Sequence, residues 1–201
     1  MTVSIDRDKA PGFARAPLTA RLRSAPSIDA AKVVRLMLAF FGDSEVPQAR
    51  TLAAEAIPAP YRPLLAHAGH MTEVLERHHG GALRVQPYRI HREGDIYGRR
   101  IDLFAAGVDG PVMTGIMIFN LALVAPAVRD EIVGAKSPLG EILIRHRILR
   151  RVAPDAFLAF EATDPLVARF GSAADRPAYG RLATIDCDQR PAVDLLEIVR
   201  P

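Results

Sequence analysis

The chain has 201 residues and a mass of 21.9 kDa, a length typical of one domain. Hydrophobic residues make up 49% and charged residues 24%, which excludes disorder across the whole chain. The net charge is only +3, and the single Cys187 excludes both an intramolecular disulfide and a cysteine-rich zinc site. No apolar run reaches the roughly 18 residues of a membrane-spanning helix.

The start of the chain differs in character from the rest. Residues 1–15 carry Asp6 and Asp8 and no apolar stretch, so a signal peptide is not expected and a cytoplasmic location is predicted. Residues 1–60 are interpreted as an N-terminal arm, a helix over 29–41 with Ser27 and Asp29 as candidate N-caps, and a proline-rich connector. Residues 61–201 are expected to form the main domain, and the whole chain one globular unit.

Beyond this point the pattern alternates between strands and helices. Gly80 is expected to end a helix, and Pro87 predicts an edge strand or a bulge. The predicted helices cover 72–79, 126–133, 139–149 and 164–170. The predicted strands cover 83–90, 96–104, 112–123, 157–162, 181–188 and 192–199. Short turns between several strands indicate an antiparallel sheet with inserted helices, which is an α+β domain.

Two charged residues fall on the apolar side of predicted strands. Side chains of a strand alternate between faces, which places Arg99 on the side of Ile101 and Leu103. By the same rule Glu197 lies among aliphatic side chains, namely Val193, Leu195 and Val199. A buried charge is costly unless it is paired. Three explanations stay open: a polar cavity, an ion pair between the two residues, or a shifted strand register.

Four segments, in this order and spacing, resemble the chorismate pyruvate-lyase family. They read LLAHAGHMTEVLERHHG (64–80), YGRRIDL (97–103), SPLGEIL (137–143) and YGR…PAVDLLEIVRP (179–201). The resemblance covers residues 64–201, about two-thirds of the chain. It implies a six-stranded antiparallel sheet with helices on one face and helical flaps over a buried ligand cavity. The interval from Pro191 to Glu197 is one residue longer than in the ubiquinone-pathway enzymes, which predicts a bulge or a shifted glutamate.

The resemblance also implies an activity and a set of site residues. The reaction would be the cofactor-free removal of pyruvate from chorismate, a carbon–oxygen lyase step that yields 4-hydroxybenzoate and uses no metal. Arg99 would bind the ring carboxylate, and Glu197 would act at the reacting end of the substrate. Met71 and Leu139 would line the substrate site. Arg99 and Glu197 are therefore the predicted catalytic pair.

Other functions compete with the lyase. One is a related synthase that makes 3-hydroxybenzoate, and another is a non-catalytic domain of the same fold that binds a small aromatic acid, as in some transcription regulators. Residues 1–60 are too short and proline-rich for a winged helix with a linker, which favours an enzyme without a nucleic-acid or membrane partner. A monomer is slightly favoured. A metal site at His67, His70, His78 and His79 is disfavoured, because no cysteine pair or carboxylate stands at ligand spacing.

Overall fold

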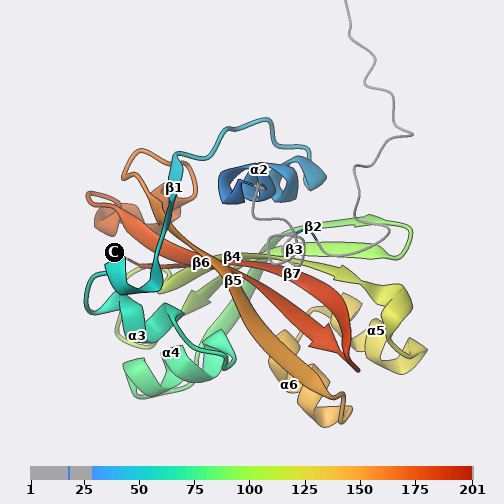
Figure 1. Cartoon of the computed structure of the whole chain (residues 1–201). Helices are drawn as coiled ribbons and strands as arrows, with labels where there is room; N and C mark the ends of the chain where they lie inside the picture. The colour runs from blue at the N-terminus through green and yellow to red at the C-terminus, as the bar shows by residue number, and fades with distance from the viewer. Residues whose placement is uncertain (1–17, 19–28, 201) are drawn as a thin grey trace, which may run out of the picture.

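Figure 1 shows a computed structural model of the chain, which describes residue 18 and residues 29–200. The predicted N-terminal arm therefore lies outside the described residues, apart from Leu18, which packs into the core. In the described part the predicted α+β class is confirmed, with a single antiparallel sheet and helices against it. No helix of the described part is long and apolar enough to cross a membrane.

The sheet has seven strands in the order β1-β5-β6-β7-β4-β3-β2, and each neighbouring pair is antiparallel. The strands are β1 (Ala49–Leu52), β2 (Arg84–Glu93), β3 (Ile96–Phe104), β4 (Met113–Asn120), β5 (Arg150–Phe160), β6 (Ala178–Cys187) and β7 (Arg190–Val199). β7, the last strand of the chain, lies in the middle of the sheet between β4 and β6. Arg99 and Glu197 are thus on strands separated only by β4.

Helices cover both faces of this sheet. The α-helices are α2 (Ala30–Phe40), α3 (Tyr61–Leu65), α4 (Met71–His79), α5 (Pro126–Gly134) and α6 (Leu139–Arg145). The 3-10 helices are η1 (Ala54–Ala56), η2 (Leu121–Leu123) and η3 (Val167–Ala173). Of the described α-helices, α3 to α6 lie on one side of the sheet and α2 lies on the other (Figure 1), where η3 belongs to the same hydrophobic cluster as α2. The expected layer of helices is present, with α2 as an addition on the opposite face.

The α2 side explains why strands such as β7 are apolar on both faces. Leu196 and Ile198 belong to the hydrophobic cluster that includes α2, whereas Val193 and Val199 pack on the opposite face. Gly98 of β3 lets α2 approach closely. A Cβ atom at this position would lie 2.6 Å from Phe40 Cε1 and 2.8 Å from Phe41 Cζ. The end of α2 therefore rests on bare backbone of the sheet.

Charged side chains that β3 directs to the α2 side are all paired. Arg100 binds Asp43, which also binds Arg89. Asp102 accepts two hydrogen bonds from Arg169 Nε at 3.0 and 3.1 Å. These pairs satisfy the requirement that buried charges have partners. The charged residue on the other face of β3 is Arg99, whose surroundings differ.

The structure departs from the sequence prediction in the proline-rich segment and in β5, and it shows a bulge where a bulge or a shifted glutamate was expected. The proline-rich segment contributes β1, which pairs with residues 157–160 of β5. β5 also starts at Arg150, earlier than expected, because a register shift beside Pro154 lets the strand continue through the proline. The longer interval before Glu197 forms the predicted bulge: Ile185 pairs with Val193 and Asp186 with Pro191, so Ala192 is the extra residue.

We predict that Gly98→Ala destabilises the fold. The new methyl group has no room between β3 and the two phenylalanine rings, and overpacking of this kind costs roughly 1–3 kcal/mol of unfolding free energy. Urea denaturation measures the loss. Gly81→Ala is the matched control, because a Cβ there meets nothing within 4 Å. Equal stability of the two variants would show that α2 does not depend on this contact.

Candidate ligand-binding site

A cavity of about 110 Å³ lies between the sheet and helices α4 and α6. Its size is comparable to a cavity of roughly 150 Å³ that holds a benzene ring. Its lining is mainly apolar and includes three methionines, Met71, Met113 and Met117. The four site residues expected from the sequence also line it: Met71, Arg99, Leu139 and Glu197. Strand alternation and the two helical flaps thus bring residues from four elements to one small space.

Arg99 is the most unusual residue of this cavity. Its side chain is almost fully buried, with 1% exposure, on the face that the strand alternation predicts. Neither Nε nor Nη1 has a hydrogen-bond partner, and Nη2 reaches only the carbonyl oxygen of Ser137 at 3.5 Å. Burial lowers the pKa of Arg99 from its ordinary value, yet a guanidinium stays protonated in proteins. A charged donor therefore faces the cavity with its hydrogen-bonding capacity largely unused.

Glu197 has a different partner from the one considered in the sequence analysis. Its Oε2 accepts a hydrogen bond from Arg181 Nε at 2.7 Å, and no ion pair joins it to Arg99 among the described residues. Arg181 lies on β6, directly opposite Glu197 in the sheet register. The pair explains how a carboxylate can be tolerated among aliphatic side chains. It also engages the carboxylate that the resemblance placed at the reacting end of the substrate.

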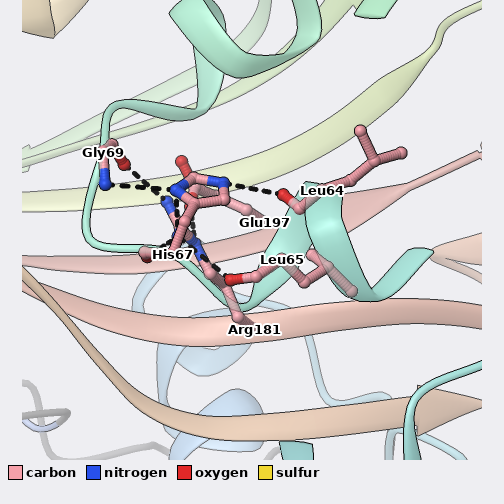
Figure 2. A network of polar contacts seen from close by, with 6 residues as sticks. All are labelled: Leu64, Leu65, His67, Gly69, Arg181 and Glu197. Atoms are coloured by element: carbon pink, nitrogen blue, oxygen red, sulfur yellow. Dashed lines mark hydrogen bonds and ion pairs between the residues drawn. The ribbon is translucent and has the colours of Figure 1, made fainter. Parts of the chain in front are cut away.

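Arg181 also fastens the loop between α3 and α4 to the sheet (Figure 2). Its Nη1 donates to the carbonyl oxygens of Leu65 at 3.2 Å and His67 at 2.7 Å, and its Nη2 donates to that of Gly69 at 3.3 Å. All three nitrogens of this fully buried guanidinium therefore have acceptors. Because the loop leads directly into α4, Arg181 fixes the wall that carries Met71.

His67 completes this network as a neutral ring. Its Nδ1 accepts the backbone N–H of Gly69 at 3.1 Å, so its Nε2 carries the proton and donates to the carbonyl oxygen of Leu64 at 2.8 Å. Burial, and then the charge of Arg181, lower the pKa of His67. His70, which precedes α4, accepts a hydrogen bond from Arg150 Nε at 2.6 Å. Burial and the charge of Arg150 likewise lower the pKa of His70.

Arg181 is the functional residue that the sequence analysis missed. The signal was present, because Arg181 shares its strand face with Ala183 and Ile185, both of which are buried. His67 and His70 hold backbone and Arg150 hydrogen bonds. No group of three or more His, Cys, Asp or Glu residues in the described part could hold a metal. Cys187 is buried, and burial raises its pKa to about 12, which is unfavourable for a nucleophile.

Comparison with known proteins gives matches only among solved structures, since neither a protein-family description nor a curated protein matches the chain. The C-terminal domain of the histidine utilization repressor from Pseudomonas syringae is 15% identical, with a TM-score of 0.42; the match covers 59% of this chain and 91% of that one. A ligand-binding domain assigned to a GntR-family transcriptional regulator from Bordetella bronchiseptica is 11% identical, with a TM-score of 0.40 and coverages of 58% and 84%. PhnF from Mycobacterium smegmatis is 12% identical, with a TM-score of 0.49 and coverages of 92% and 86%.

These findings contradict the predicted chorismate pyruvate-lyase. The similar structures include domains of transcriptional regulators rather than enzymes, so the predicted carbon–oxygen lyase activity and its product 4-hydroxybenzoate are wrong. The expectation that the protein has no nucleic-acid partner is wrong for the same reason, because the similar structures include domains of transcriptional regulators. A non-catalytic binding domain, the alternative considered above, agrees better. At this level of similarity, the particular ligand of any of those proteins does not carry over to this chain.

We predict that the fold loses stability as the pH falls below about 6.5, the ordinary pKa of histidine. His67 and His70 have lowered pKa values in the folded protein, so the unfolded chain binds more protons in acid. The stabilisation is complete above the unfolded pKa and is lost as the pH falls through the folded one. Urea denaturation between pH 5 and pH 8 measures this slope. His67→Asn keeps an acceptor near Gly69 but does not titrate, so the slope should become shallower. An unchanged slope in His67→Asn would show that this ring stays uncoupled from folding.

Proposed function

We propose that this domain is a non-catalytic receptor for a small organic acid, which binds in the cavity with its carboxylate on Arg99. The observation that carries the proposal is the buried guanidinium of Arg99, whose Nε and Nη1 have no hydrogen-bond partner. A buried charge without a partner is expensive. The planar guanidinium matches a carboxylate in shape and charge, and a bound carboxylate would remove this cost.

The remaining lining indicates what kind of molecule carries the carboxylate. Met71, Met113 and Met117 are flexible and polarisable, and methionine sulfur contacts aromatic rings favourably. Leu139 adds an apolar wall from α6. Glu197 lines the cavity at a different position, where its carboxylate can accept hydrogen bonds. The best ligand is therefore a compact, largely apolar acid with a hydrogen-bond donor that reaches Glu197.

The cavity supports binding rather than catalysis. Arg181 holds Glu197, the buried carboxylate of the cavity, in an ion pair. We therefore expect no pyruvate above the uncatalysed rate when the protein is incubated with chorismate. Pyruvate formed in proportion to protein concentration would contradict the non-catalytic role.

Binding of benzoate and 4-hydroxybenzoate, measured by calorimetry, tests the carboxylate site. Both should bind, and neutral benzamide should not, because it lacks the charge that Arg99 requires. Arg99→Gln should weaken benzoate binding by about 10- to 100-fold, the value expected for a hydrogen bond to a charged group. Arg35→Gln removes a positive charge from the exposed face of α2 and is the matched control. Equal affinity of Arg99→Gln and the unchanged protein would place the ligand elsewhere.

We further predict that Arg99→Met stabilises the ligand-free protein. Replacing a buried charge that lacks a partner by an apolar side chain of similar length removes a desolvation cost, as replacements of buried ionic groups by apolar ones often do by about 1–4 kcal/mol. Urea denaturation without ligand should show a higher midpoint for the variant. Benzoate should raise the midpoint of the unchanged protein and leave that of Arg99→Met where it is. A destabilised Arg99→Met would show that the guanidinium already has sufficient partners.

A further inference from the structure

Acidic side chains surround the cavity on the side away from the sheet. Glu73 and Glu76 of α4 and Glu141 of α6 line it together with the sheet residues. None of the three forms an ion pair with a residue that the structure describes; Glu76 only accepts the backbone N–H of Leu83 at 3.2 Å. Glu73 and Glu141 are exposed and Glu76 is half-buried, so these carboxylates mark the mouth of the cavity between the two helices.

The charges of the floor and of the mouth are thus opposite in sign. Arg99 is the only lysine or arginine among the described residues that line the cavity. Glu197 is already neutralised by Arg181, and His70 has a lowered pKa. A ligand that carried only a carboxylate would compensate Arg99 and leave the carboxylates of the mouth without a counter-charge.

We infer that the ligand is a zwitterion, with its carboxylate on Arg99 and a cationic nitrogen group at the mouth facing Glu73, Glu76 and Glu141. This inference rests on the proposed function, because Arg99 supplies the orientation. A ligand of this class satisfies the buried guanidinium and the acidic mouth at once. Ile144 lies at the same mouth and is 44% exposed, although it is a large aliphatic residue. It offers an apolar surface for the carbon chain or ring that joins the two charged ends.

One alternative places no cation at the mouth. Glu73 and Glu141 lie in the first turns of their helices, where acidic residues are favoured by the helix dipole. On this explanation they stabilise the helices and contribute nothing to selectivity. Glu76 lies one turn further along α4, where that explanation does not hold. The zwitterion inference and the helix-dipole explanation differ in one expectation. Only the first expects that neutralising the three glutamates changes the preference for an ammonium-bearing acid over an apolar one.

Matched pairs of acids test the inference. In 6-aminohexanoate an ammonium group replaces the terminal methyl of heptanoate, and 4-(aminomethyl)benzoate is related to 4-ethylbenzoate in the same way. Calorimetry should show that the ammonium member of at least one pair binds about 10-fold or more tightly than its apolar partner. In the triple variant Glu73→Gln, Glu76→Gln and Glu141→Gln, this advantage should fall below about 2-fold, while the apolar member keeps its affinity.

A charge-matched control separates a local effect from a change in net charge. Glu45, Glu55 and Glu161 are exposed and do not line the cavity, so replacing all three by glutamine should leave the ammonium advantage intact. If the apolar acids bind as tightly as their ammonium partners, and binding still requires Arg99, the zwitterion inference is wrong and the carboxylate receptor stands. If none of the four acids or the benzoates binds, both are wrong.

Discussion

The site depends on the placement of a permanently charged guanidinium inside a covered sheet without a protein anion to match it. Arg99 shares β3 with Arg100 and Asp102, and those two charges are paired on the α2 side. On the cavity side the same strand leaves Arg99 with two nitrogens unpartnered. Since folding alone gains nothing from such an arrangement, the cavity is best understood as built around an anion that arrives from solution.

Arg181, on the same face of the sheet, has a hydrogen-bond acceptor for each of its three guanidinium nitrogens. It binds Glu197 and three carbonyl groups of the α3–α4 loop, so one side chain both neutralises the cavity's buried carboxylate and anchors the wall that precedes α4. The two arginines therefore have separate roles. One makes the cavity rigid and gives it an acceptor at Glu197, and the other leaves a donor open to the ligand.

Strand alternation predicted the buried position of Arg99 and Glu197, because both lie in strands whose side-chain direction is fixed by period two. The extra residue before Glu197 predicted a bulge or a shifted glutamate, and the structure has a bulge at Ala192. The Glu197–Arg181 pair was not predicted, since it depends on which strands become neighbours, and that is a property of the whole sheet. β1 was missed for a related reason: a four-residue edge strand in a proline-rich segment is defined by its partner more than by its own sequence.

A crystal structure of the protein grown with benzoate is the most direct test of whether Arg99 binds a carboxylate in the cavity. We expect a carboxylate in the cavity between the sheet and α4 and α6, with an oxygen about 2.7–2.9 Å from a nitrogen of Arg99. Arg181 should remain on Glu197 and on the loop carbonyls. Benzoate bound at another place, with the guanidinium of Arg99 still without an anion, would show that Arg99 is not the carboxylate-binding residue.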